Sequence, residues 1–107
     1  MTTTDLAILG RWRIIETDLW DKDYLDMLGP AHITFRPDGA SEFAFGAVTA
    51  NLQCYYASDG VSSAWIGFDE IDEVSGEGSA DIDDDGTLDG EISFHNGDEA
   101  QFKARKE

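Results

Sequence analysis

The sequence has a single cysteine, few basic residues and no long apolar run. Cys54 has no second cysteine to pair with, so an intramolecular disulfide is excluded and a reducing, cytoplasmic setting is favoured. The segment MTTTDLAILG has no basic stretch and too short an apolar run, so we expect neither a signal peptide nor a membrane span. The 107 residues predict one packed domain over residues 10–107, preceded by a tail at residues 1–9.

Basic residues are scarce: seven Lys and Arg stand against 23 Asp and Glu, for a net charge of −16. A field of this sign repels nucleic-acid phosphates and anionic lipid headgroups, so neither nucleic acid nor a membrane surface is expected as a partner. This negative charge has two interpretations. It can simply keep the protein soluble, or it can indicate adaptation to high salt, where dissolved ions screen the repulsion between the carboxylates.

Enzyme signatures are also missing. The chain has no Gly-x-Ser-x-Gly, no phosphate-binding P-loop, no His-Glu-x-x-His, no Cys-x-x-Cys and no dinucleotide fingerprint. We therefore expect no cofactor. The first functional hypothesis is non-catalytic binding of a small apolar ligand or a protein partner.

Two-residue alternation of apolar and polar side chains, interrupted by turn dipeptides, runs through most of the chain. Helical periodicity is confined to WDKDYLDMLG, where Asp21 can cap a short helix that stops at Gly29-Pro30. About eight strands at this spacing predict an all-β, antiparallel up-and-down barrel with one short helix after the first strand. Closure is favoured over a stacked sandwich because it removes the strand edges.

Apolar residues should oppose one another across neighbouring strands, which predicts the register of each hairpin. Near the C-terminus this rule pairs Ile82 with Leu88 around the turn Asp84-Asp85-Gly86, and Ile92 with Phe102. The many Phe residues on the inward face predict a filled interior, although small residues on the last three strands leave room for a modest cavity.

The same rule pairs Leu52 with Ile66 in the middle of the chain. Cys54 then points inward as a buried small hydrophobe, while Tyr55 and Trp65 lie on the outer face of adjacent strands. Adjacent exposed aromatics either shield the strand ladder or form a surface for a protein partner or a homodimer.

The first predicted strand carries Gly10-Arg11-Trp12, which resembles the Gly-x-Trp signature of the calycins, the lipocalin-like barrels. That resemblance implies a Trp closing one end of the barrel and a basic residue of the last strand lying over it, a place that Arg105 matches. The segments WIGFDEIDEVSGEG and FHNGDEAQFKARK resemble a family of short uncharacterised bacterial proteins, a likeness that implies no activity.

The stretch ADIDDDGTLDGEI resembles a calcium-binding loop at first sight. Asp81, Asp83 and Asp85 fall at the first, third and fifth ligand positions, but Ile92 stands where the bidentate Glu is required. The interpretation as a hairpin turn also explains the apolar pairing around it, so we keep these three carboxylates only as weak metal candidates.

Connections in an up-and-down barrel alternate between its two ends, which brings distant residues to one rim. The residues expected there, as ligand-binding candidates, are Trp20, Asp21, Asp69, Glu70, Asp72, His95 and Asp98. An alternative hypothesis is an enzyme with metal-assisted or general acid–base chemistry, whose catalytic candidates are His95, Asp98, Asp69 and Glu70. These residues can equally be solvated rim charges.

The excess of carboxylates predicts a salt-dependent stability. We expect the melting temperature to rise by several degrees between about 0.1 M and about 2 M KCl, because screening weakens the mutual repulsion of the charges. The measurement is a thermal unfolding series in KCl. A melting temperature unchanged at molar salt would rule out the high-salt interpretation.

Overall fold

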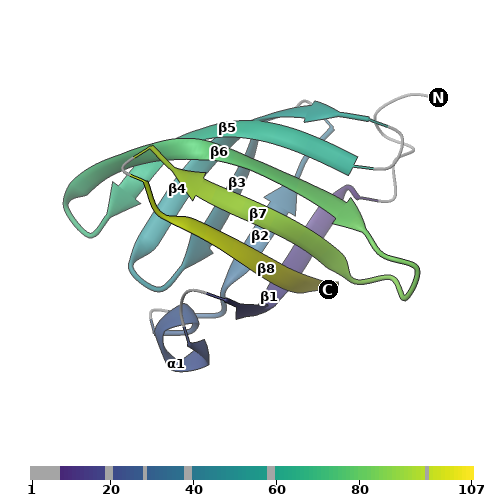
Figure 1. The fold of residues 1–107 in the computed structure, drawn as a ribbon, viewed down its shortest axis with the longest axis horizontal. Coiled ribbons are helices and arrows are strands. Elements are labelled where there is room, and N and C mark those ends of the chain that lie inside the picture. Colours follow the sequence, from purple (N-terminus) through teal and green to yellow (C-terminus); the bar gives the residue numbers. More distant parts are fainter. Residues whose placement is uncertain (1–7, 19–20, 28, 38–39, 58–59, 96) are drawn as a thin grey trace.

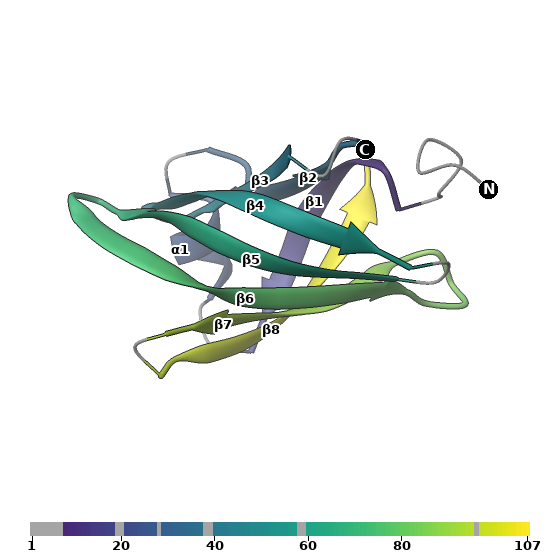
Figure 2. The ribbon, with the colours of Figure 1, turned by 90° about the horizontal axis from the view of Figure 1, so that it is seen from above.

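Eight strands and one short helix make up the fold in a computed structural model, which describes residues 8–18, 21–27, 29–37, 40–57, 60–95 and 97–107. The elements are β1 (Gly10–Thr17), α1 (Lys22–Leu25), β2 (His32–Phe35), β3 (Ala40–Phe45), β4 (Val48–Tyr56), β5 (Gly60–Asp69), β6 (Asp72–Ile82), β7 (Leu88–Phe94) and β8 (Glu99–Lys106). Each strand pairs antiparallel with the next, and β8 returns to β1 (Figure 1). Figure 2 shows the closed barrel from above. The predicted fold class is therefore confirmed.

Buried and exposed residues alternate along the strands, so that one face of each strand lines a common core. Phe35, Phe45, Ile92 and Phe102 all point inward and are at most 4% exposed. Each such side chain stabilises the fold by about 1.5–3 kcal/mol relative to an exposed position. Within the described residues no helix has the length and apolar character needed to cross a lipid bilayer.

Glycines on the inward faces of β6 and β7 make room for large aromatic rings. A Cβ atom on Gly76 would lie 2.7 Å from Cζ2 of Trp65, and one on Gly90 would lie 2.4 Å from the ring of Phe102. The small residues thus complement bulky ones instead of leaving space. The cavity that remains among these core side chains measures about 10 Å³, which is room for one water molecule at most.

Both ends of the barrel are closed by side chains. At one end Leu25 of α1 is buried, its carbonyl accepts a 2.8 Å hydrogen bond from the Gly46 amide, and the Tyr24 ring lies over Gly46. At the other end the buried Trp12 donates from Nε1 to the Ile8 carbonyl at 2.8 Å.

A cation does lie over Trp12, as the calycin resemblance implies, but it is Lys106 and not Arg105. The Lys106 Nζ atom is 4.8 Å from the centre of the Trp12 ring and also donates to the Leu9 carbonyl. Arg105 follows the inward-facing Ala104 and is therefore on the outer side of β8. A contact of this kind contributes about 0.5–2 kcal/mol.

The register of the C-terminal hairpins is predicted in part. Ile82 does pair with Leu88, and the turn between them is tightened by the Gly86 amide donating to the Asp83 carbonyl at 2.9 Å. In the next hairpin Ile92 pairs with Ala100 and not with Phe102. A slip of two residues leaves every side chain on its predicted face, so the core is unchanged.

The register of β4 with β5 differs from the prediction by one residue, which reverses the faces of β5. Leu52 pairs with Trp65, not with Ile66. The faces of β4 are as predicted, with Cys54 buried and Tyr55 exposed, but Trp65 is only 4% exposed. The prediction that Tyr55 and Trp65 share an outer surface is therefore wrong.

The aromatic core explains why Trp65 and not Ile66 faces inward. The Trp65 ring meets Phe43 and Phe94 edge to face, with centroid distances of 5.2 and 4.9 Å. Its Nε1 atom donates to the Glu77 carbonyl at 3.1 Å, so the buried indole keeps a hydrogen-bond partner. Strand β5 has apolar residues at both odd-numbered and even-numbered positions, and the contacts of Trp65 decide which set faces the core.

The fit between Trp65 and Gly76 can be tested by adding one methyl group. In Gly76→Ala the new Cβ would lie 1.8 Å from the Ser93 carbonyl oxygen as well as against the indole. We expect this overpacking to lower the free energy of unfolding by about 3 kcal/mol, measured by urea denaturation.

Gly78→Ala is the matched control, since Gly78 lies on the same face of β6. Its added Cβ would meet nothing closer than the Glu91 carbonyl oxygen at 3.0 Å, so we expect a loss below about 1.5 kcal/mol. Equal losses for the two variants would contradict the proposed role of Gly76.

Candidate binding surface

The outer face of β4 and β5 carries no charged side chain. It is a ladder of four cross-strand pairs, and all eight side chains are exposed: Thr49 with Phe68, Asn51 with Ile66, Gln53 with Ala64, and Tyr55 with Ser62. We call these eight residues the neutral face. In Figure 2 it lies on the side of β4 and β5 turned toward the reader.

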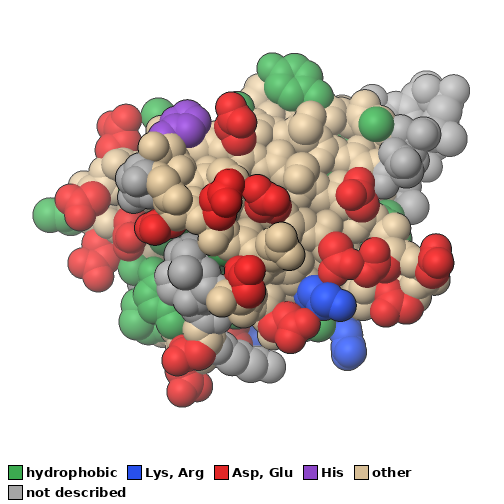
Figure 3. Space-filling view, in the orientation of Figure 1, with side chains coloured by type: hydrophobic (Ala, Val, Ile, Leu, Met, Phe, Trp, Pro, Cys, Tyr) green, Lys and Arg blue, Asp and Glu red, His purple; other side chains and the backbone are tan. Residues whose placement is uncertain are grey.

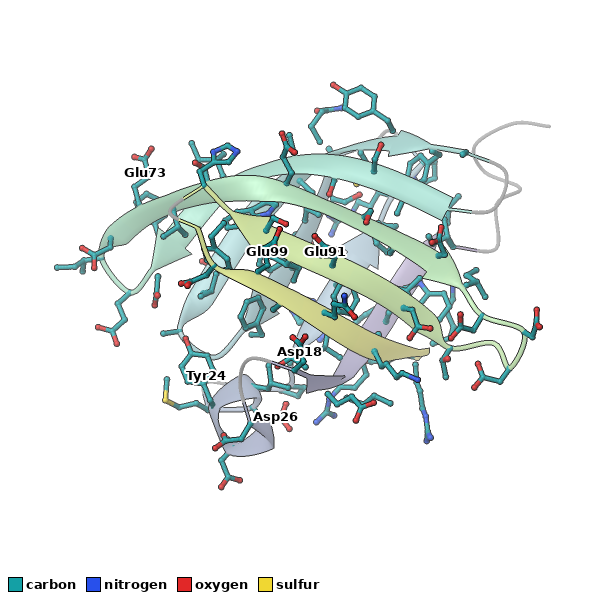
Figure 4. The ribbon with its side chains drawn as sticks, viewed as in Figure 1. Asp18, Tyr24, Asp26, Glu73, Glu91 and Glu99 are labelled. Atoms are coloured by element: carbon teal, nitrogen blue, oxygen red, sulfur yellow. The ribbon has the colours of Figure 1, made fainter. Side chains whose placement is uncertain are left out.

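Acidic residues occupy the neighbouring outer surface. The outward positions of β6 include Glu73, Glu77 and Asp81, and those of β7 include Asp89 and Glu91. Figure 3 shows Asp and Glu side chains spread over the face formed by β6, β7 and β8. Figure 4 shows Glu91 on the outside of the barrel wall and Glu73 projecting away from β6. The neutral face therefore contrasts with an adjoining surface of strongly negative potential.

Large apolar side chains on the neutral face are left in contact with solvent. Ile66 is 55% exposed and Phe68 is 51% exposed. Ile71 is not one of these eight residues, but it lies in the turn between β5 and β6, three residues after Phe68, and is 91% exposed. Full burial of one such side chain is worth about 1.5–3 kcal/mol, so this surface retains a driving force for association that folding does not use.

Two shallow grooves run over this part of the barrel. One, of about 610 Å³, lies between β3, β4 and β5 and includes Ala40, Gln53 and Ala64 in its lining. The other, of about 510 Å³, lies toward the β3–β4 turn, and Asn51 and Ile66 line both. These grooves are large enough to accept side chains that protrude from another macromolecule.

The edge of the neutral face on the β2–β3 side is held by Arg36. Its guanidinium forms an ion pair with Glu42 and also approaches the Ala40 carbonyl oxygen at 3.4 Å. The Arg36 carbonyl accepts a hydrogen bond from the Tyr56 hydroxyl at 2.8 Å. These contacts position the Arg36–Glu42 ion pair beside the neutral face.

The same edge contains His32, whose surroundings disfavour a proton. Its Nδ1 atom is buried and has no hydrogen-bond partner among the described residues. Burial lowers the pKa of His32, and the nearby Arg11 lowers that pKa further, while Glu42 and Glu107 act in the opposite direction. The neutral imidazole is therefore the form that the folded protein favours.

Of the rim residues predicted from the topology, those that the structure describes have separate structural roles. The Asp21 carboxylate accepts from the Tyr24 amide at 2.9 Å and caps α1 as predicted. Asp69 and Asp72 face each other across the β5–β6 hairpin, and Glu70 between them has a left-handed backbone with φ of 58°. Trp20 lies outside the described residues.

His95 is engaged by the neighbouring strand. Its Nδ1 atom is 3.0 Å from the Ser75 hydroxyl, and its amide donates to the Ser75 carbonyl at 2.9 Å. The Asp98 carbonyl accepts from the Phe94 amide at 2.7 Å, which closes the β7–β8 turn. Across the described residues no group of three or more His, Cys, Asp or Glu side chains is placed to hold a metal ion.

The acidic loop after β6 is organised as a turn. Asp85 Oδ1 accepts hydrogen bonds from the amide and the hydroxyl of Thr87, at 3.0 and 2.6 Å, and these bonds lower the pKa of Asp85. A hydrogen bond with Asp89 raises the pKa of Asp83. Asp81 is on the outer side of β6, opposite Asp89. The three weak metal candidates therefore make local contacts of their own.

Sequence reasoning missed Ile66 as a surface residue because it paired Ile66 with Leu52, and this one-residue shift also hid the exposure of Phe68. A signal was nevertheless present on β4, where the alternate residues Thr49, Asn51, Gln53 and Tyr55 are all uncharged. In a chain with 28% charged residues, such a run on one exposed face indicates that charge is disfavoured there.

His32 predicts a pH dependence of stability. The unfolded chain binds a proton at this side chain with a pKa of about 6.5, whereas the folded chain binds it only at lower pH. The unfolded state therefore gains protons first, and stability falls as pH decreases from about 7.5 to about 5.5. We expect His32→Gln to remove part of this loss, measured as the urea midpoint at both pH values.

His95→Gln is the matched control, because His95 is the second of the two histidines and is exposed. We expect His95→Gln to retain the wild-type pH dependence. The same pH dependence in wild type and His32→Gln would show that His32 is not its source.

Comparison of the chain with models of known protein families, with curated proteins and with solved structures finds no match.

Proposed function

We propose that this chain is a non-catalytic binding module that engages a protein partner through the neutral face. One observation carries the proposal: eight exposed side chains on two adjacent strands are uncharged in a chain whose net charge is −16. The cores of protein interfaces are depleted in charged residues relative to the rest of the surface. Ile66 and Phe68 supply the apolar anchors that such an interface needs.

A protein partner is better supported than a small apolar ligand inside the barrel. The internal cavity of about 10 Å³ is far below the several hundred cubic ångströms of a typical ligand pocket. Leu25 and Trp12 close the two ends of the barrel, so a ligand would have to displace packed side chains to enter.

The rim gives less support to metal-assisted or acid–base chemistry. His95 hydrogen-bonds to Ser75, and Asp69 and Asp72 belong to the β5–β6 hairpin. A general base must reach the proton that it removes, and a nucleophile or metal must stand beside it. With its ring directed to Ser75, His95 serves to hold neighbouring strands together, and the proposal assigns the rim no catalytic role.

Photocrosslinking in cells of the source organism tests the proposed function. A benzophenone amino acid replaces Gln53, at the centre of the neutral face, and in a second variant it replaces Gln101. Gln101 is the matched control because it is also an exposed glutamine on the outer side of a strand, β8. We expect a discrete covalent adduct of higher mass from position 53 and none from position 101.

The control decides between specific and random contact. An adduct that is lost when Ile66→Asp is added would support the neutral face as the contact surface. Identical patterns from positions 53 and 101, or no adduct from position 53, would refute the proposed function.

A further inference from the structure

We infer that the barrel binds a phosphate or sulfate group in a pocket on its outer surface, between Arg11 and His32. The pocket measures about 220 Å³ and is lined by residues of β1, β2, β3 and β4 and by Gly29 and Pro30, which precede β2. We call it the Arg11 pocket. It adjoins the neutral face at Thr49, which belongs to both. The inference does not rest on the binding role proposed above, because it concerns a different ligand and different charged residues.

The outward row of side chains across β2, β3 and β4 makes room for the pocket. His32 pairs with Ala44, and Ala44 pairs with Thr49, so the three side chains stand next to one another on the outer wall. The middle side chain is a single methyl group, which leaves a gap between the imidazole and the Thr49 hydroxyl. Arg11 borders the same space from β1. Hydrogen-bond donors from three strands therefore surround one small space.

The lining of the Arg11 pocket differs in charge from the rest of the surface. None of the described residues that line it is acidic, although the chain contains 23 Asp and Glu. Two larger surface grooves do include carboxylates, Asp89 in one and Glu73 in the other. The net charge of −16 repels anions at long range, so an anion is held only where donors outnumber carboxylates at contact distance. The Arg11 pocket meets this condition.

The Arg11 guanidinium has two terminal amino groups without a partner among the described residues. Its one ion pair runs from Nε to Oε1 of Glu107 at 3.4 Å, between side chains that are 47% and 42% exposed. Exposed pairs of this kind contribute little to stability. Nη1 and Nη2 therefore stay available, and a planar guanidinium can donate to two oxygens of one phosphate or sulfate. Arg13, the next outward residue of β1, differs because its guanidinium donates to Asp26 at 3.2 Å.

His32 provides an independent observation that points to a ligand. Its Nδ1 atom is buried and lacks a hydrogen-bond partner among the described residues. Buried polar atoms almost always have such a partner, which can be the protein, a water molecule or an ion. The imidazole lines the Arg11 pocket, so an oxyanion there would supply an acceptor to the ring. An unpartnered ring nitrogen and an unused guanidinium fork thus require the same kind of ligand.

Anion binding in the Arg11 pocket is coupled to the proton of His32. Burial and the charge of Arg11 lower the pKa of His32, while Glu42 on β3 and Glu107 act in the opposite direction. Arg13, the partner of His32 on β1, is already ion-paired. A bound anion favours the imidazolium form, so binding raises the pKa of His32 and becomes tighter as pH falls. We expect an affinity about threefold higher at about pH 5.5 than at about pH 7.5.

Titration of the purified chain with sodium sulfate tests the inference, because the charge of sulfate does not change in this pH range. The measurement follows the imidazole resonances of the two histidines by NMR at constant ionic strength. We expect the His32 resonance to shift saturably with a Kd on the order of millimolar, and its titration midpoint to move to higher pH. The His95 resonance should not follow, because His95 bonds to Ser75 and does not line the Arg11 pocket.

Three variants separate a built site from a diffuse positive field. Arg11→Gln should weaken sulfate binding by at least about tenfold. Arg105→Gln is the matched control, since Arg105 is an exposed arginine of β8 that does not line the pocket, and it should change the affinity by less than about twofold. His32→Gln, followed through the Ala44 amide resonance, should lose the pH dependence of binding. Circular dichroism of each variant establishes that the fold is retained.

Saturable sulfate binding that Arg11→Gln weakens and Arg105→Gln does not would support the inference. A His32 shift that never saturates, equal losses in the two arginine variants, or an unchanged pH dependence in His32→Gln would overturn it and leave the proposed function intact. Parallel titrations with inorganic phosphate and with glycerol phosphate distinguish the source of the group. Tighter binding of the ester assigns it to a small molecule, and tighter binding of the ion assigns it to free phosphate; either result supports the site.

Discussion

The Trp65 indole, packed against Gly76, determines which side of β5 belongs to the core. The glycine provides a hollow that no other residue type would leave, and Phe43 and Phe94 enclose the ring from two sides. Because side chains alternate along a strand, burying Trp65 forces Ile66 and Phe68 outward. An interior contact thus dictates the chemistry of the outer surface.

The filled interior and the acidic wall act together on where binding can occur. Core packing leaves about 10 Å³ of internal space, too little for a ligand, so the proposed binding is assigned to the outside of the barrel. There the carboxylates of β6 and β7 discourage contact with any acidic protein, while the outer face of β4 and β5 carries no charge. The outer surface thus combines a negatively charged wall, which repels acidic proteins, with a face that does not.

The closed barrel and most of the core follow from alternation and turn residues, which are local properties of the sequence. The position of Ile82 opposite Leu88 is one example, since the Asp84-Asp85-Gly86 turn permits few geometries. Strand β5 is harder because Trp65 and Ile66 both suit the core, and only the hollow at Gly76, eleven residues away on another strand, decides between them. The neutral face depends on that non-local choice, so it could not be located from the sequence alone.

The pairing of β1 with β8, which closes the barrel, determines where the two ends of the described chain lie. We call this junction the seam. The Glu107 amide donates to the Arg11 carbonyl at 3.0 Å, and Lys106 reaches the Leu9 carbonyl, so the first and last described residues adjoin. Three strands separate this seam from β4 in one direction around the wall, and three separate it from β5 in the other. Domains or labels joined at either end of the described chain would emerge together, on the side of the cylinder remote from β4 and β5, and would leave those strands unobstructed.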